Sequence, residues 1–476
     1  MHSTRSPRTR KTQGTIAYRL VRMMIRLLLW LFYRRIDVVG RERIPPDGGV
    51  IVAANHHNSV VDAMLIIATV PRAVTVLANA PLFRHPLVGP LLRMLGAVPV
   101  NRRLEAGDDP RRNEGMFTAA IDALRAGGVV LIFPEGRTQP QPILLPLRTG
   151  AARLALGLER AAGGPHLVTL LPVGIVFHDP GIFRSASVQL TIGAPVATAD
   201  IFASHRERPE EAVRVITARL TESIGERIVE AEDHYTLGLL AVLERAWWEE
   251  AARRGEPAPA PDKIAEQALA WKRQVMRAAR YLGEREPQLV AELRRRVERY
   301  RGHLDEVGIA SEQLGRTYTA RFMVSYVAAN VLWLALCLPL ACWGIACHAV
   351  PYWMTGQIVP WLGRTLEEEA TDKMAVGLVI YPLLWGVEGW LVWRLAGLAP
   401  LLAFLLLLAP SGLLALAWRE RLGRVAGQAR AFLRFLADRD LHRRLLDERR
   451  ALAEELRALA DRVPPEVLSH GTRDAG

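Results

Sequence analysis

The residues best suited to chemistry lie in residues 53–65, AANHHNSVVDAML, where His56 and His57 precede Asp62 by a few positions. The apolar run GGVIVAA before the histidines predicts a buried strand, and SVVDAMLIIA after them predicts a helix. An aspartate beside an imidazole fixes its tautomer and stabilises the imidazolium that forms when the other ring nitrogen takes a proton. Such a pair can activate a weak nucleophile such as an alcohol.

The same stretch also fits two other roles. Ser59-Val60-Val61-Asp62 matches the capping box [ST]-x-x-[DE], whose side chains bind the first backbone N–H groups of a helix. Histidine and aspartate are also metal ligands, which would suit a metal-dependent phosphoesterase. The sequence contains no further clustered His/Asp motif, and we therefore expect no metal site. Between a helix cap and a catalytic pair, this stretch alone does not decide.

A second stretch, VVLIFPEGRTQPQPILLPLRTGAARLALG, places polar residues where a predicted strand ends. The turn is Glu135-Gly136-Arg137, and α/β folds place their ligand contacts at the carboxyl ends of buried strands. Guanidinium groups bind phosphate bidentately, so Arg137 and Arg148 are candidate phosphate ligands. Arg102 in GAVPVNRR follows another predicted strand and is a third candidate. The alternative is a solvated loop with ordinary surface arginines.

Five regions can be separated along the chain by composition. Residues 1–35 form a basic tail and an amphipathic helix suited to an anionic bilayer surface, or else an ordinary surface helix. Residues 36–204 alternate short β-rich runs with helix-like stretches and predict an α/β domain. Residues 205–320 predict a charged helical region. Residues 321–418 are largely apolar, and residues 419–476 predict an Arg-rich cytoplasmic amphipathic helix and tail.

The apolar region predicts an integral membrane protein. Residues 322–353 contain no Lys, Arg, Asp or Glu. This segment is longer than the roughly 20 residues needed to cross a bilayer. Residues 374–393 are apolar apart from Glu388, and residues 395–418 follow after Arg394. We therefore expect two to three membrane segments. So few ionisable groups argue against a channel or transporter.

Arginines precede the first apolar segment and follow the last one, which predicts that both flanks and the catalytic domain lie on the cytoplasmic side. This orientation requires an even number of crossings. The two later segments would then form one tilted or re-entrant element, or one of them would lie in the interface. The net charge of +12 suits an anionic membrane or nucleic acid. Because the arginines flank membrane segments and no recognition motif is present, we expect no nucleic-acid partner.

Four blocks of this chain, NHHNSVVD, GAVPVNRR, FPEG and LLPVGIVF, resemble in order and approximate spacing those of the glycerolipid acyltransferase family. That family includes glycerol-3-phosphate and 1-acylglycerol-3-phosphate (lysophosphatidate) acyltransferases. The longer strings ANHHNSVVDAML, LLPLRTGAARLALG and FRSASVQLTIGAPV are most similar to its fungal-type glycerol-3-phosphate/dihydroxyacetone-phosphate branch and bacterial relatives. The resemblance covers about residues 36–200. It implies an α/β acyltransferase domain, with a central mixed sheet flanked by helices, and a C-terminal helical membrane region.

The resemblance also implies a mechanism. A histidine acts as general base on the glycerol hydroxyl, Asp62 orients it, and the hydroxyl attacks an acyl thioester directly. Arg102 maps to the phosphate-binding arginine, and Glu135 and Gly136 map to the acceptor-binding block. The common family spacing of four residues between histidine and aspartate selects His57 as the base, whereas the fungal-type spacing of five selects His56. We predict His56 as the base, with His57 in positioning.

The sequence thus predicts a membrane-bound O-acyltransferase in phosphatidic acid and phospholipid synthesis. The donor is acyl-CoA or acyl carrier protein, and the acceptor is glycerol-3-phosphate or dihydroxyacetone phosphate, with lysophosphatidate as the alternative. We expect no cofactor. We expect membrane lipids to be partners of the protein. The oligomeric state stays open.

Overall fold

A computed structural model describes residues 15–84, 88–100, 114–162, 168–178, 183–184, 187–204, 208–258, 260, 263–308, 314, 320–361 and 366–469. Its centre is a seven-stranded sheet of order β1-β7-β6-β2-β5-β3-β4. The strands are β1 (Arg35–Val39), β2 (Gly49–Ala54), β3 (Val74–Asn79), β4 (Val98–Val100), β5 (Val129–Ile132), β6 (Val168–His178) and β7 (Ser187–Ile192). All neighbours pair in parallel except β6 and β7, which are antiparallel. The predicted mixed sheet is therefore confirmed.

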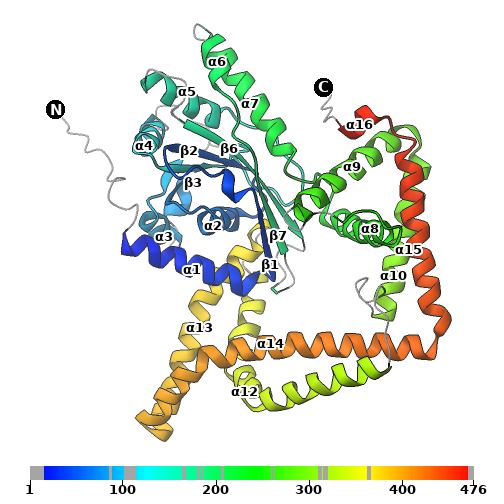
Figure 1. Cartoon of the computed structure of the whole chain (residues 1–476). Helices are drawn as coiled ribbons and strands as arrows, with labels where there is room; N and C mark the ends of the chain where they lie inside the picture. The colour runs from blue at the N-terminus through cyan, green and yellow to red at the C-terminus, as the bar shows by residue number, and fades with distance from the viewer. Residues whose placement is uncertain are drawn as a thin grey trace.

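Helices cover both faces of the sheet because its central strands are apolar on both sides (Figure 1). Strand β2 is buried at every position. One face packs against α1 (Ile16–Phe32), α2 (Ser59–Thr69) and α3 (Val88–Met94). The other packs against α4 (Glu114–Arg125), α5 (Gly150–Ala162) and α7 (Pro209–Gly225), with the short α6 (Ala199–Ser204) before α7.

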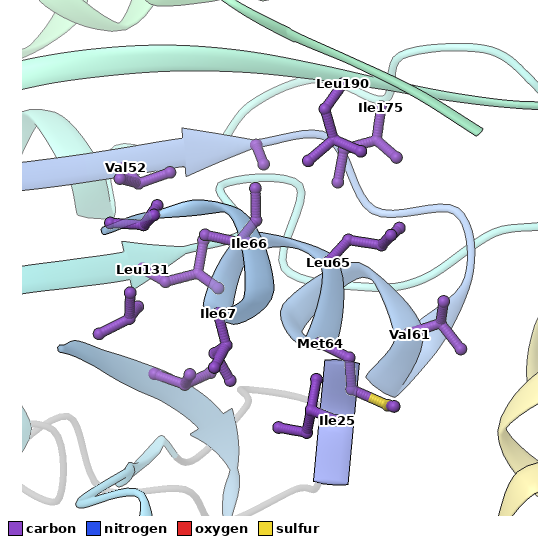
Figure 2. Close-up of a cluster of buried hydrophobic side chains, with 14 of the residues drawn as sticks. Ile25, Val52, Val61, Met64, Leu65, Ile66, Ile67, Leu131, Ile175 and Leu190 are labelled. Carbon is purple, nitrogen blue, oxygen red and sulfur yellow. The ribbon is translucent and has the colours of Figure 1, made fainter. Parts of the chain in front are cut away.

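Helix α2 is the apolar centre of the first face. Figure 2 shows Leu65 and Ile66 of α2 beside the sheet residues, with Met64 facing Ile25 of α1. Leu65 is fully buried. Burial of a Leu or Ile side chain contributes about 1.5–3 kcal/mol, so this packing fixes the helix that carries Asp62.

Helix α1 is apolar on two faces. Its residues Tyr18, Val21, Ile25, Leu29 and Phe32 are buried, while Ile16, Leu20, Met23, Leu27 and Trp30 are exposed. Two of its arginines bind the carboxyl end of α2: Arg26 donates to the Ala68 carbonyl at 3.0 Å, and Arg22 donates to the Val70 carbonyl. These two cations therefore hold α2 in place. The membrane-surface role of α1 stays a prediction.

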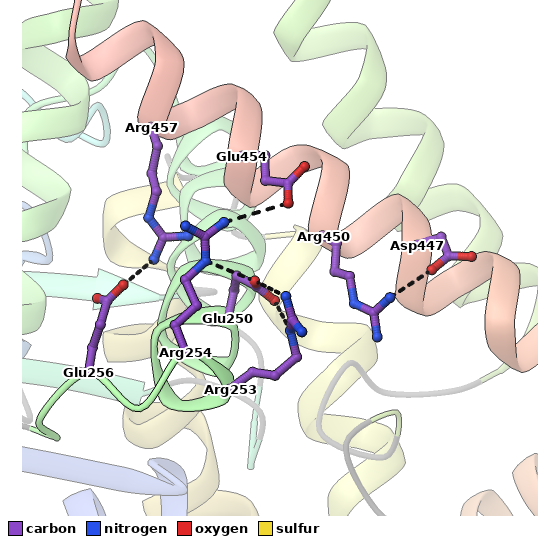
Figure 3. A network of polar contacts seen from close by, with 8 residues as sticks. All are labelled: Glu250, Arg253, Arg254, Glu256, Asp447, Arg450, Glu454 and Arg457. Atoms are coloured by element: carbon purple, nitrogen blue, oxygen red, sulfur yellow. Dashed lines mark hydrogen bonds and ion pairs between the residues drawn. The ribbon is translucent and has the colours of Figure 1, made fainter.

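The two charged regions pack together into one helical unit of α8 (His234–Arg253), α9 (Ile264–Arg285), α10 (Pro287–Val307), α15 (Arg439–Ala460) and α16 (Pro465–Ser469). Figure 3 shows the ion pairs between the end of α8 and α15. Arg254 lies 3.5 Å from Glu454, and Arg457 lies 2.9 Å from Glu256. Exposed pairs contribute little stability, so the shared apolar core is what joins these helices.

Three helices are long and apolar enough to cross a membrane, among the residues that the structure describes: α12 (Ala320–Trp361), α13 (Leu366–Ala396) and α14 (Leu398–Ala437). They indicate membrane association. The chain turns between α13 and α14 at Gly397, whose φ of +90° favours glycine. The two later segments are therefore separate helices, and their arrangement as one tilted or re-entrant element stays a prediction. The number of crossings stays a prediction.

The apolar helices are fastened to the sheet domain at two places. Ala370 and Met374 near the start of α13 join the apolar cluster that contains α2. Arg184, just before β7, donates to Glu420 of α14 at 2.7 Å. The helix that carries Asp62 therefore contacts a candidate membrane helix directly (Figure 1).

Candidate active site

The turn between β2 and α2 pairs His56 with Asp62. The Asp62 Oδ2 atom lies 2.8 Å from His56 Nδ1 and also accepts from the Asn58 backbone N–H at 2.8 Å. His56 and Asp62 are both buried, Asp62 completely. One carboxylate oxygen thus orients the imidazole and closes the first turn of α2.

The predicted capping box forms only in part. The helix begins at Ser59 with Asn58 as its N-cap, and no side chain caps it. The carboxylate half exists, but Asp62 binds the N–H of Asn58, one residue earlier than the pattern predicts. Ser59 has a φ of +42°, a conformation that costs a non-glycine residue about 1–3 kcal/mol. The turn is shaped by the His56–Asp62 contact rather than by the serine.

The His56 ring is fixed on two sides. Because Asp62 accepts from Nδ1–H, the proton-accepting nitrogen is Nε2. The ring stacks on Phe133 at the end of β5, with centroids 4.0 Å apart and an interplanar angle of 11°. The imidazole is therefore held in one tautomer and one orientation, as a general base requires.

His57 faces the neighbouring loop instead of Asp62. Its Nδ1 lies 3.4 Å from the Gln139 carbonyl. Burial lowers the pKa of His57 to about 4, although the negative charge of Asp62 raises it in part. His57 is therefore neutral near pH 7, and its positioning role stays a prediction.

Glu135 holds the histidine turn and the following loop together. Its Oε1 accepts from the His56 backbone N–H at 2.7 Å, and its Oε2 accepts from Leu145 N–H at 3.0 Å. Only 3% of Glu135 is exposed, and burial raises its pKa to about 7, which the two backbone N–H groups partly oppose. Both carboxylate oxygens are engaged by the backbone, which favours a positioning role over the substrate contact implied by the resemblance.

Arg148 lies against the turn after Glu135. Gly136 has a φ of +71°, and a Cβ there would come within 2.7 Å of Arg148 Nε. The Arg148 backbone N–H also donates to the Pro134 carbonyl at 2.7 Å. Arg137 is exposed in the same turn. Arg102 lies outside the described residues. Phosphate binding by these arginines stays a prediction.

Asn55 was not singled out from the sequence, although it is the first residue after β2. Its side-chain Nδ2 donates to the Ile175 carbonyl at 2.9 Å, and its Oδ1 accepts from Ile175 N–H at 2.7 Å. These bonds fix the end of β2 to β6 and set where the histidines emerge. A polar residue directly after a buried strand is the only sequence signal of this role. No group of three or more His, Cys, Asp or Glu that could hold a metal is found in the described part of the chain.

Residues 35–176 match the family model described as Acyltransferase. The matched segment begins with β1, ends within β6, and contains His56, Asp62 and Glu135. This is an acyltransferase domain of the glycerolipid acyltransferase family.

Two curated relatives illustrate the similarity of the acyltransferase domain. Glycerol-3-phosphate O-acyltransferase 2 of Saccharomyces cerevisiae is 28% identical over 210 residues, which cover 44% of this chain and 26% of the yeast protein. The 1-acyl-sn-glycerol-3-phosphate acyltransferase of Bacillus subtilis is 26% identical over 200 residues, covering 42% of this chain and 88% of the relative. The chain thus spans about a quarter of the yeast protein and most of the bacterial one.

A crystal structure of the 1-acyl-sn-glycerophosphate acyltransferase from Thermotoga maritima is 26% identical. The match covers 43% of this chain and 78% of that chain, with a TM-score of 0.31. At that score, the fold assignment of the acyltransferase domain rests on its own sheet order and on the family match.

Proposed function

We propose that this acyltransferase moves a fatty acyl group from a thioester donor to a hydroxyl of a glycerol phosphate, as a step in phospholipid synthesis. The observation that carries the proposal is the buried contact of 2.8 Å between His56 Nδ1 and Asp62 Oδ2, within an acyltransferase domain. It supplies the base that a weakly nucleophilic hydroxyl needs.

In the proposed reaction, His56 Nε2 takes the hydroxyl proton while the hydroxyl oxygen attacks the thioester carbonyl carbon. The new C–O bond forms, the C–S bond breaks, and the departing thiolate takes the proton from the imidazolium. The Asp62 carboxylate stabilises the positive ring between these steps, as its contact with Nδ1 allows. Every atom and proton is accounted for without an acyl-enzyme.

We propose glycerol-3-phosphate or dihydroxyacetone phosphate as the acceptor, with Arg148, Arg137 and Arg102 as phosphate ligands. The name of the yeast relative supports glycerol-3-phosphate. Lysophosphatidate is the second candidate, because the bacterial relative matched over 88% of its length bears that activity in its name. Both acceptors carry the same phosphate, so the arginines serve either one.

The proposed location is a membrane, with the acyltransferase domain on its cytoplasmic side. Support comes from the three apolar helices and from the contact of α13 with α2. A fatty acyl product belongs in a bilayer, and a catalytic helix that touches a membrane helix lies close to it. The donor is acyl-CoA or acyl carrier protein.

The test uses the full chain in detergent with labelled acyl-CoA or acyl carrier protein and each of the three acceptors in turn. We expect an acylated glycerol phosphate from the wild type and none above background from His56→Ala. A chain that acylates none of the three acceptors from either donor would refute the proposal.

A further inference from the structure

A cavity of about 720 Å³ lies beside the candidate active site. Its volume falls within the range of about 300–1,000 Å³ that small-ligand sites occupy. The loop that follows the Glu135 turn forms one wall, with Leu144 and Leu147. Helix α7 forms the second with Arg214, and α9 forms the third with Arg280. Two of the three walls therefore lie outside the matched acyltransferase segment.

Both arginines of this cavity, Arg214 and Arg280, are exposed. Within the described part of the chain, no hydrogen bond or ion pair reaches the exposed Arg214 or Arg280 guanidinium. By contrast, Arg219 on the same helix as Arg214 forms two hydrogen bonds with Asp200, at 2.9 and 2.6 Å. Two arginines from separate helices thus line one cavity, and guanidinium groups match a phosphate-bearing ligand.

The one carboxylate in the cavity wall is already engaged. Glu230 accepts from the Leu144 backbone N–H at 3.0 Å and attracts the nearby Arg273, whose pKa it helps to sustain. The negative charge of Glu230 is therefore partly compensated by groups of the protein itself. With two arginines and one carboxylate, the cavity carries a net positive charge.

The remaining walls suit a nucleotide base. Leu144, Pro146 and Leu147 provide apolar surface. The Thr217 hydroxyl donates to the Val213 carbonyl at 2.7 Å, and the Thr221 hydroxyl donates to the Thr217 carbonyl at 2.8 Å. Because their protons are used by the helix, these hydroxyls offer the cavity only acceptor lone pairs, which suit an amino group.

One loop separates this cavity from the catalytic turn. Two consecutive backbone N–H groups point to its two sides: Leu145 donates to Glu135, which holds His56, and Leu144 donates to Glu230 in the cavity wall. Arg148 of the same loop lies over Gly136. A long ligand with phosphates at one end and a thioester at the other can therefore lie along this loop from the cavity to His56.

We propose that this cavity binds the phosphorylated nucleotide end of acyl-CoA, with Arg214 and Arg280 at its phosphates. The assignment of the ligand as the acyl donor rests on the proposed acyl transfer. It names a donor-binding site on α7 and α9 and selects CoA over acyl carrier protein.

The binding test measures the affinity of the full chain in detergent for CoA and for dephospho-CoA, which lacks the 3′-phosphate. We expect wild type to bind CoA about tenfold more tightly, since a hydrogen bond to a charged group contributes enough for that ratio. Arg214→Gln and Arg280→Gln should weaken CoA binding about tenfold and lose the preference. Arg285→Gln, an exposed arginine of α9 outside the cavity, is the matched control and should behave as wild type.

The kinetic readout separates this site from the acceptor site. Both cavity variants should raise the KM for acyl-CoA about tenfold and leave kcat and the acceptor KM unchanged. Equal binding of CoA and dephospho-CoA by wild type, unchanged affinity in both variants, or turnover with acyl carrier protein alone would overturn the inference. Binding is measured without turnover, so a chain that binds CoA as expected but transfers no acyl group would refute only the proposed function.

Discussion

Replacing Asp62 by asparagine isolates the charge of the catalytic pair from its shape. Both contacts of Asp62 use the same oxygen, Oδ2, which lies 2.8 Å from His56 Nδ1 and 2.8 Å from Asn58 N. An asparagine can place its amide oxygen at that position, so the tautomer of His56 and the turn are retained. Only the negative charge beside the imidazolium is lost.

The size of this effect follows from Coulomb's law. Two unit charges at about 4 Å and an effective dielectric constant near 20 attract by about 4 kcal/mol. Removing that attraction from the transition state corresponds to a roughly thousandfold fall in kcat. The new amide N–H groups lie at the buried Oδ1 position, which has no hydrogen-bond partner among the described residues. Leaving them unpaired costs about 1–3 kcal/mol of folding stability.

The assay is steady-state acyl transfer by the folded variant, with thermal unfolding in parallel. Glu159→Gln is the matched control, because Glu159 is also fully buried but binds Thr198 at 2.7 Å, away from the catalytic turn. It should lower stability and leave kcat within about twofold. A folded Asp62→Asn enzyme that keeps more than about a tenth of wild-type kcat would refute the assigned role of the carboxylate.

Three further predictions concern neighbouring residues. Burial raises the Glu135 pKa from 4.5 to about 7, so the native state binds more protons than the unfolded state between these pH values. The free energy of unfolding therefore falls by about 3 kcal/mol as pH rises from about 4.5 through 7. Glu135→Gln should remove this dependence, measured by denaturation at pH 4.5 and 8. Burial lowers the His57 pKa from 6.5 to about 4. Its contribution to the free energy of unfolding is therefore present above pH 6.5 and is lost as pH falls through 4. His57→Gln should reduce this loss of stability at acid pH, whereas an unchanged loss would assign it to other groups. Leu65→Ala should cost about 2–5 kcal/mol by leaving a cavity in α2 packing, and a Tm within error of wild type would contradict the described core.

The strands, and the turn and helix that carry His56 and Asp62, could be predicted because local patterns determine them. The run GVIVAA is β2 itself, and the residues after it form the expected turn and helix. Which imidazole meets Asp62 could not be read from spacing, since two spacings fit. In the structure the turn that carries both histidines begins at Asn55, whose bonds to Ile175 span 120 residues of sequence.

Long-range contacts could not be predicted from local patterns. The sequence placed Glu135 in a turn at a strand end, but it did not indicate that the carboxylate oxygens accept from the backbone N–H groups of His56 and Leu145. The basic helix of residues 1–35 was predicted from its pattern, but the contacts of Arg22 and Arg26 with carbonyls at the end of α2 were not. A periodic pattern shows which face a residue occupies and not which element covers it.

The apolar helices also have features that could be predicted from the sequence and features that could not. Composition alone predicted apolar helices, because length and the lack of charge determine that property. The start of α13 is rich in charged residues, and nothing local indicated that Ala370 and Met374 join the core beside α2. The two later segments, which the sequence divides at Arg394, are joined in the structure by a turn at Gly397.

The most direct test of the central claim compares His56→Gln and His57→Gln in one acyl-transfer assay. The structure places His56 on Asp62 and His57 on the Gln139 carbonyl. We therefore expect His56→Gln to lower kcat by about 10²–10⁴, and His57→Gln to stay within about tenfold of wild type with an unchanged pH–rate profile. A folded His56→Gln enzyme with near wild-type kcat, together with an inactive His57→Gln enzyme, would contradict the assignment of the base.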